Sequence, residues 1–397
     1  MTNITGWKFA VAATLLMAVG TLGLAFQSHR AVTSDIAAAR EVRMFEAVTK
    51  PPLAQLQMKL LKTPLQPDLL HGLVAHRVSQ RGAKRFSTAE RQALESLGWQ
   101  STVVQMDLIQ DGVARGDEAV VLTRIDGLLR RGKQMQPLIE LVVQIEQTGD
   151  DARGKLVKML SAKPNWRRNF LIAPVGMAGN KAVLARAETL DGMFASQLAP
   201  LREEVAPIVN TLEAMGESQR AGALWRKFHT IGRAAPVPFD PVFVGLAANP
   251  LDGQYQTMVY EWRAGQGAGF SVRASSIGDS SAVLGIRWDG RGAPVLLQQR
   301  LLTGPGRFAI KVKGSLLDRS ALQRVAFVFY CSAAPPVFHD RLSQGPNGEF
   351  IFAANEVVSC PNPELRLVGM SEDSMSPLEM EFTSIRITRF ARNTNLR

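Results

Sequence analysis

The chain has 397 residues, 46% of them hydrophobic, and its 46 Lys and Arg residues against 35 Asp and Glu residues give a formal net charge of +11. A chain of this length holds two or three domains of roughly 100–200 residues, with enough apolar residues for a large core. The charge favours acidic partners such as anionic polysaccharide, phospholipid head groups or nucleic acid, and charge alone does not choose among them. No nucleic-acid-binding motif accompanies it, which argues against a nucleic-acid partner. Most basic residues are dispersed arginines with short clusters such as Arg167-Arg168, which we interpret as solvated surface.

The first element is an uncharged apolar run at residues 9–26. It is long enough to span a bilayer as a helix, so the sequence predicts a transmembrane anchor within residues 1–30. A cleaved signal peptide remains the alternative, because Gly23-Leu24-Ala25 is a small-x-small triplet. Either reading places the body outside the cytoplasm, and the favoured one predicts a single-pass protein of the bacterial inner membrane with its body in the periplasm. The basic residues that follow the run, beginning with Arg30, leave its orientation open.

Helical patterns fill the next part of the chain. Residues 31–52 have helical spacing and end at Pro51-Pro52, which predicts a juxtamembrane helix. From 53 to 235 apolar residues recur every three or four positions, so this region is predicted to be a helical domain. Its helices are interrupted by Gly and Pro residues at Pro64, Pro67, Gly82, Gly98, Gly116, Gly132, Gly149 and Pro164.

The helical region also repeats one arrangement. Val103–Ala114 and Val120–Leu129 are two helical runs joined by a turn, in which Gly116 ends the first helix and Asp117 caps the second. Val205–Met215 and Ala221–Phe228 repeat this arrangement around Gly216, and Leu69–Gly82 offers a degenerate copy of a first helix. Stacked helix pairs of this kind resemble tetratricopeptide repeats (TPR), which present a concave surface to a partner.

The pattern changes at a proline-rich linker, so residues 236–392 are predicted to be an antiparallel β-sandwich of the jelly-roll type. Gly and Pro turns separate the alternating apolar and polar segments. The predicted strands are Thr257–Ala264, Phe270–Ser276, Ala282–Trp288, Val295–Leu302, Arg307–Gly314, Arg324–Ser332, Glu349–Asn355, Leu365–Gly369 and Leu378–Arg389.

Two features of this region concern its core. Val325–Cys331 is almost continuously hydrophobic, which predicts a strand buried on both faces. Cys331 and Cys360 are the two cysteines of the chain, and outside the cytoplasm they could form a disulfide worth about 3 kcal/mol. Two separate buried thiols are the alternative.

The order of these elements resembles a largely uncharacterised alpha-proteobacterial envelope family. The resemblance is carried by Pro164–Phe170, the Leu224-Trp225 helix, Leu302–Phe308 and Cys360-Pro361. It implies a C-terminal part similar to galactose-binding-like carbohydrate modules and a setting in exopolysaccharide synthesis or export. Where such modules often carry an acidic residue in the last strand, this chain has Ser384, so a calcium-supported role there is not expected.

No constellation of residues predicts catalysis, a cofactor or a metal site. His71 and His76 are five residues apart, on different faces of a helix, and no acidic residue completes a zinc motif. Gly265–Gly269 lies between predicted strands and is interpreted as a hairpin turn. Carboxylates in the β-region could serve a glycosidase only if two of them met across a sugar, and solvent-facing positions are the favoured reading. These carboxylates are Asp279, Asp289, Glu349, Glu356, Glu379 and Glu381.

Aromatic residues near strand ends are the better candidates for a sugar site, because sugar faces stack on rings. The candidates are Trp262, Trp288, Tyr260 and Tyr255, with burial in the core as the competing reading. Three tryptophans on helical positions, Trp99, Trp166 and Trp225, are assigned to the core.

The function expected from the sequence is therefore that of a non-catalytic scaffold or binding protein. Its helices would bind an envelope protein, and its sandwich would contact acidic polysaccharide. In the alternative, the sandwich is purely structural and the chain acts only in protein assembly. A glycan-modifying enzyme is a further alternative.

Overall fold

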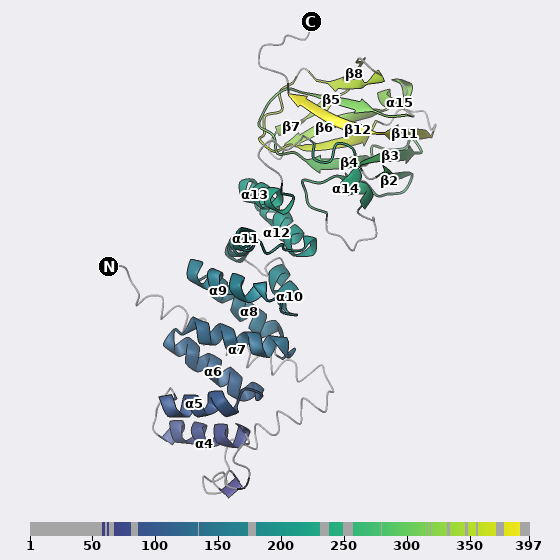
Figure 1. The fold of residues 1–397 in the computed structure, drawn as a ribbon. Helices are drawn as coiled ribbons and strands as arrows, with labels where there is room; N and C mark the ends of the chain where they lie inside the picture. The colour runs from purple at the N-terminus through teal and green to yellow at the C-terminus, as the bar shows by residue number, and fades with distance from the viewer. Residues whose placement is uncertain are drawn as a thin grey trace, which may run out of the picture. The chain divides into compact units, whose positions relative to one another are not determined.

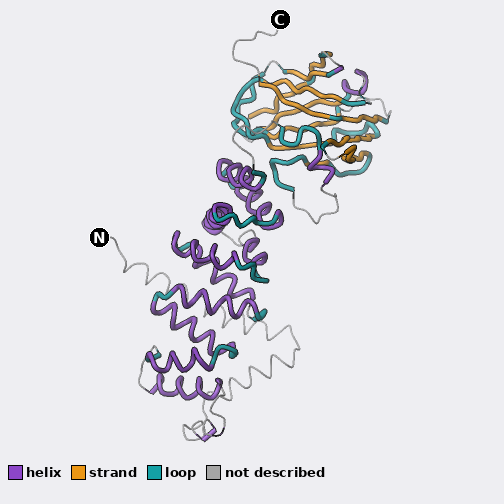
Figure 2. The backbone as a smooth tube through the Cα atoms, viewed as in Figure 1, coloured by secondary structure: helices purple, strands orange, loops and turns teal. Residues whose placement is uncertain are grey.

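The computed structural model shows helices followed by β-strands, in that order along the chain (Figures 1 and 2). It describes residues 58–59, 62, 67–80, 86–133, 135–173, 180–230, 238–248, 257–278, 280–315, 317, 319–331, 334–345, 348–354, 356–370 and 377–389. The chain divides into two compact units. The first extends to Ile145 and includes Pro164–Trp166, and the second comprises Glu146–Lys163 and the chain from Arg167 onward.

The fold class needs one correction. Among the described residues no helix is long and apolar enough to cross a membrane. The longest, α11 (Asn180–Ala195), has 16 residues, whereas a spanning helix needs about 20 predominantly apolar ones. The predicted anchor at residues 9–26 and the juxtamembrane helix at 31–52 lie outside the described residues. The described chain is α+β, and the transmembrane part of the predicted fold class and the inner-membrane location are wrong on this finding.

The first unit is built from helices, and local side chains cap three of them at Ser87, Ser101 and Asp117. The helices are α4 (Pro67–Gln80), α5 (Thr88–Leu97), α6 (Thr102–Arg115) and α7 (Glu118–Arg130), and α8 (Met135–Glu146) ends at the unit boundary. Between α6 and α7, Gly116 has a left-handed φ of 72°, and the Asp117 side chain accepts a hydrogen bond from the backbone N–H of Val120. The predicted helix–turn–helix is therefore confirmed.

The helical part of the second unit ends in a hairpin of the same kind. Its helices are α9 (Asp150–Ser161), α10 (Arg167–Ile172), α11, α12 (Arg202–Ala214) and α13 (Ser218–Phe228). Gly216 turns the chain between α12 and α13 with a φ of 82°, which confirms the second predicted helix pair.

The three helical tryptophans divide between core and surface. Trp166 and Trp225 are buried, as predicted, whereas Trp99 is 57% exposed. The assignment of Trp99 to the core was wrong because this residue follows the Gly98 cap of α5, where the helical periodicity no longer applies.

The strands form antiparallel sheets that enclose one apolar core. They are β1 (Arg263–Ala264), β2 (Phe270–Gly278), β3 (Ser281–Trp288), β4 (Val295–Arg300), β5 (Phe308–Lys313), β6 (Val325–Cys331), β7 (Ala334–His339), β8 (Arg341–Gln344), β9 (Phe350–Ala353), β10 (Glu364–Gly369), β11 (Leu378–Phe382) and β12 (Ser384–Arg389). A five-stranded sheet has the order β1-β4-β10-β6-β7, a three-stranded sheet β11-β3-β2, and a four-stranded sheet β12-β5-β9-β8. Residues from all three sheets share the core. Two short helices accompany the strands: α14 (Val244–Ala248) packs on β2 and β3, and α15 (Arg319–Gln323) packs on β6 and β11.

The predicted sandwich differs from the observed one in several places. The segment predicted as one strand, Leu378–Arg389, breaks at Thr383, so that β11 pairs with β3 while β12 pairs with β5. Strand β7 was missed because it contains Pro335-Pro336, yet it lies at a sheet edge, where proline is tolerated. The hairpin turn predicted at Gly265–Gly269 is confirmed only locally: Gly267 and Phe270 form an isolated antiparallel bridge, but β1 pairs with β4 and β2 pairs with β3.

Strand β6 confirms the clearest strand prediction. Val325, Phe327 and Phe329 enter the main core, while Ala326 and Val328 lie in a small separate cluster on the opposite face. All five side chains are buried. The near-continuous apolar sequence of β6 therefore reflects burial on both faces of the five-stranded sheet.

Candidate functional site

Buried carboxylates paired with arginine recur throughout the described chain. The buried acidic residues are Asp111, Glu146, Glu204, Glu213, Glu261 and Glu364, and each contacts at least one arginine. Arg186 and Arg167 are themselves buried, so the interpretation of the arginines as solvated surface was wrong at these positions. A carboxylate buried without such a partner would be strongly destabilising.

The most enclosed of these pairs lies among the helices of the second unit. Arg186 and Glu146 have no exposed side-chain area and are joined by two hydrogen bonds of 2.8 and 2.9 Å. Thr189 donates a further bond to Glu146, and the Arg186 guanidinium lies over the ring of Phe170 at 3.6 Å from its centre. This arrangement satisfies both charges within the fold and leaves them no evident chemical role.

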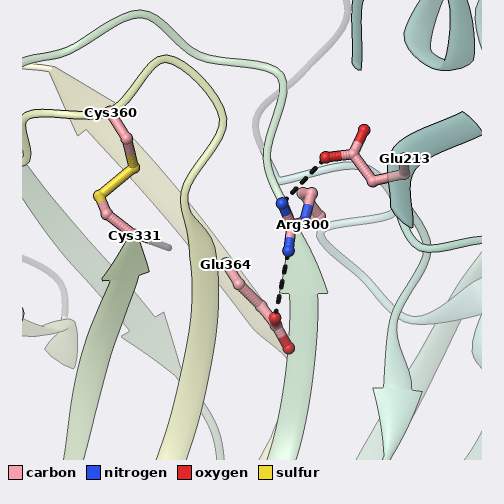
Figure 3. Close-up of a disulfide and its surroundings, with 5 residues drawn as sticks. All are labelled: Glu213, Arg300, Cys331, Cys360 and Glu364. Atoms are coloured by element: carbon pink, nitrogen blue, oxygen red, sulfur yellow. Dashed lines mark hydrogen bonds and ion pairs between the residues drawn. A yellow bond between two sulfur atoms is a disulfide. The ribbon is translucent and has the colours of Figure 1, made fainter. Parts of the chain in front are cut away.

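A second group of pairs joins α12 and α13 to the sandwich, and we call it the junction: Arg202, Glu213, His229, Tyr260, Glu261 and Arg300. Glu213 of α12 accepts hydrogen bonds from Arg300 of β4 at 2.9 Å and from the Tyr260 hydroxyl at 2.5 Å. Figure 3 shows Arg300 between the carboxylates of Glu213 and Glu364. Burial, together with the hydrogen bond to Glu213, raises the pKa of Tyr260, which stays protonated as a donor.

Glu261 forms the other half of the junction. It accepts two hydrogen bonds from Arg202 of α12, at 2.6 and 2.7 Å, and its Oε1 lies 2.8 Å from Nε2 of His229. Burial alone would raise the pKa of Glu261, but the hydrogen bonds from His229 and Arg202 outweigh it, and the net shift of the pKa is downward. The carboxylate is therefore held in its charged form.

The backbone around Glu261 is fixed to α12 as well. The side chain of Asn210 donates to the carbonyl of Thr257 and accepts from the N–H of Val259. The side chain of Leu302 packs against Gly222 of α13. A Cβ atom added at Gly222 would lie only 2.9 Å from a methyl carbon of Leu302, so the contact requires glycine. Helices α9–α13 thus belong to the same compact unit as the sandwich.

Beyond Arg300, one face of the five-stranded sheet carries a group of polar and aromatic residues that we call the arginine face. Strand register places Arg263, Gln298, Arg366, Val328 and Phe338 in one row across β1, β4, β10, β6 and β7. The adjacent row on the same face holds Arg300, Glu364 and Tyr330.

The charges of this face centre on Glu364. Its carboxylate lies 3.5 Å from Arg263, 3.5 Å from Arg300 and 3.3 Å from Arg366. Arg366 also lies over the ring of Tyr330, 4.2 Å from its centre. Burial lowers the pKa of Arg263, and its Nε is buried with no hydrogen-bond partner in the structure. The single carboxylate of Glu364 therefore forms ion pairs with three guanidinium groups.

The aromatic residues proposed from the sequence for sugar stacking lie in the interior. Trp262, Trp288 and Tyr260 are buried, with 3%, 2% and 1% of their surface exposed, and Tyr255 lies outside the described residues. The indole N–H of Trp262 donates to the Asp240 carbonyl, and that of Trp288 donates to the Arg291 carbonyl. Rings enclosed in this way offer no open face to a ligand.

The remaining predicted residues have separate positions. Cys331 and Cys360 form a disulfide, the outcome that the sequence left open (Figure 3). Of the carboxylates considered for a glycosidase, Glu349 pairs with Lys313, Glu379 pairs with Arg287 and Glu381 accepts from Ser315. Asp279 lies outside the described residues. Within the described residues, no group of three or more His, Cys, Asp and Glu side chains is arranged to hold a metal ion.

Sequence reasoning missed both the junction and the arginine face. Arg300 is 87 residues from Glu213 and Arg263 is 101 residues from Glu364 in the sequence, and only strand pairing brings Gln298 beside Arg366. The available signal was local: Arg300 and Arg366 lie in strands that mix polar and apolar residues, VLLQQR and ELRLVG. Without the strand order, that signal could not show that these residues share one face.

Comparisons with known proteins identify no family for this chain. No protein-family model matches it, and no curated protein matches it. Among solved structures it is similar to Pseudomonas fluorescens alkylpurine DNA glycosylase AlkC bound to DNA containing an abasic site analog, with 9% identity, a TM-score of 0.17, and coverage of 83% of this chain and 80% of that chain. A TM-score this low carries no argument about fold or function.

Proposed function

We propose that this protein is a non-catalytic assembly scaffold, in which helical hairpins contact a protein partner and the sandwich stabilises the end of the helical part. The observation that supports this most directly is the junction, where the buried carboxylates Glu213 and Glu261 of adjoining segments are both held by arginine. Carboxylates are the groups that often act as catalytic acids or bases. Here Glu213 and Glu261 instead pair with arginine and join the helices to the sandwich. The TPR-like character of the hairpins belongs to the same proposal.

The candidate partner contact lies on the first unit at Trp99. This ring is 57% exposed, and the Arg131 guanidinium lies 5.9 Å from its centre. Arg131 is held in place by a hydrogen bond to the carbonyl of Gln100 at 2.8 Å. Trp and Arg are the residue types that most often dominate the energy of protein interfaces, so a positioned pair on an open surface suits a protein partner.

The proposal can be tested by quantitative cross-linking and co-purification of the full chain from its native cells, with the Trp99→Ala variant alongside. We expect wild type to retain a reproducible partner set, and Trp99→Ala to lose it while its unfolding midpoint stays unchanged. Ile277→Ala is the matched control, because Ile277 is an apolar residue of the sandwich with 63% of its surface exposed. Equal loss with both variants, or with neither, would argue against a partner site at Trp99.

The setting in exopolysaccharide synthesis or export is also part of our proposal. It is supported by the resemblance drawn from the sequence, and it requires no catalytic group in this chain. Deletion of the gene with measurement of secreted polysaccharide would test it. We expect a lower yield that the wild-type chain restores, whereas an unchanged yield would contradict the setting and leave the scaffold proposal in place.

A further inference from the structure

We propose that the arginine face binds an acidic polysaccharide, with its guanidinium groups pairing with carboxylates carried by the sugars. The residues concerned are Arg263, Gln298, Arg300, Tyr330, Phe338, Glu364 and Arg366. This inference goes beyond the scaffold proposal and does not depend on it, because it concerns a different surface and a different class of ligand.

The arginine face carries more positive than negative charge. Arg263, Arg300 and Arg366 all contact Glu364, at 3.3 to 3.5 Å. Arg300 has a second partner in Glu213 at 2.9 Å, so three positive groups share two carboxylates. Charge-assisted hydrogen bonds are usually about 2.7–2.9 Å long, so the contacts to Glu364 are loose. The face thus carries one positive charge in excess and is complementary to an added carboxylate.

The guanidinium groups of the arginine face are also partly exposed and held in place. A guanidinium carries five N–H donors in a flat fork that suits bidentate binding of a carboxylate. The side chains of Arg263, Arg300 and Arg366 are each about one third exposed, at 33%, 30% and 30%. Arg366 is held over the ring of Tyr330, which fixes the plane of its fork before any ligand arrives. Preorganisation of this kind lowers the entropic cost of binding.

An aromatic ring and an amide on this face favour an acidic sugar over other anions. Phe338 lies in the same row as Arg366 and is 46% exposed, so it offers a ring to the apolar face of a sugar. The amide of Gln298 lies between Arg263 and Arg366 in this row and can bond a hydroxyl. Sugar hydroxyls can also donate hydrogen bonds to the carboxylate of Glu364, which lies at the middle of the face. A polymer of uronic acids combines all of these features.

The experiment is affinity electrophoresis of the full chain through gels containing polygalacturonate, with dextran as the neutral polymer. We expect retardation by polygalacturonate only, and weaker retardation at higher ionic strength. Arg366→Gln should weaken binding about tenfold, as expected for the loss of hydrogen bonds to a charged group. Arg287→Gln is the matched control: Arg287 lies on β3 of another sheet, and its side chain is 76% exposed. It should bind like wild type.

Other variants and probes keep the proposal testable if Arg366→Gln fails to fold. Phe338→Ala removes an exposed ring, so we expect a folded protein with reduced retardation. Three outcomes would overturn the proposal: no retardation of folded wild type, equal weakening by Arg366→Gln and Arg287→Gln, or tighter binding of single-stranded oligonucleotide than of polygalacturonate at the same face. The first would exclude this ligand, the second would indicate attraction by overall charge, and the third would identify a nucleic-acid site.

Discussion

The hairpins α6–α7 and α12–α13 share one sequence pattern but use their buried acidic residue differently. In α6, Asp111 pairs with Arg91 of the preceding helix and with Arg115 of its own helix. In α12, Glu213 pairs with Arg300 of β4 and with the Tyr260 hydroxyl, both beyond the end of the helices. A left-handed glycine turns the chain in both hairpins, at Gly116 and at Gly216, while the position of one carboxylate decides what each hairpin is joined to.

The largest predicted effect comes from removing the carboxylate that joins helix to sandwich. Glu213→Ala leaves both Tyr260 and Arg300 without this partner, so we expect the free energy of unfolding of the second unit to fall by about 3 kcal/mol. Chemical denaturation followed by tryptophan fluorescence measures it. Glu217→Ala is the control on the same hairpin, because Glu217 is exposed and lies 3.8 Å from Arg220. A similar loss in both variants would contradict a specific role for Glu213.

A smaller loss is expected for the equivalent carboxylate of the first unit. Asp111→Ala should lower the free energy of unfolding by about 2 kcal/mol, because Arg91 and Arg115 can still reach water and Asp111 Oδ1 is itself buried without a hydrogen-bond partner. Hydrogen exchange should show faster opening of α6 and α7 and no change in the strands. Gln110→Ala, at an exposed position of α6, should leave exchange unaltered. Uniform acceleration across the whole chain would refute a local effect.

The helix caps of the two hairpins provide a closer comparison. Asp117 accepts a hydrogen bond from Val120, whereas Glu217, at the equivalent position, makes no side-chain cap. Asp117→Ala should therefore lower the free energy of unfolding by about 1 kcal/mol. Glu217→Ala should lower it by less than about 0.5 kcal/mol. Paired thermal unfolding of the two variants is the measurement. Equal losses of unfolding free energy in the two variants would mean that the side-chain cap at Asp117 does not stabilise its hairpin.

The smallest effect is confined to acid pH and concerns the junction. The pKa of Glu261 is lowered from its ordinary 4.5. A lowered carboxyl pKa contributes stability that is present above pH 4.5 and is lost as the pH falls through the folded-state value. Stability measured between pH 6 and pH 3 should thus fall more steeply in wild type than in Glu261→Gln. Parallel curves for the two proteins would exclude this contribution.

Sequence patterns predicted the parts of the fold that depend on neighbouring residues. Gly116 and Asp117 locate one turn because a left-handed backbone and a short acidic cap are local requirements. Strand β6 was equally clear, because burial on both faces requires a continuous apolar run. The break at Thr383 was not predictable in the same way, since it depends on which strands pair with β11 and β12.

The candidate sites were the least predictable part, because they depend on contacts between distant residues. Trp262 and Trp288 were plausible ligand rings from composition alone, but whether a ring is exposed depends on what packs over it, and both proved to be buried. Glu364 meets Arg263 across 101 residues of sequence. No local sequence pattern predicts a contact over such a separation, so the arginine face could be identified only from the structure.

The edges of the five-stranded sheet bear on how the protein resists aggregation. An open edge strand presents unpaired N–H groups that can recruit a strand from a second copy. At one edge, β7 carries Pro335 and Pro336, both exposed and without an N–H to donate, and at the other, β1 is two residues long. Neither edge therefore offers a long row of free N–H groups to which a strand of a second copy could pair. The arginine face can stay open to solvent while the sheet edges beside it do not promote self-association.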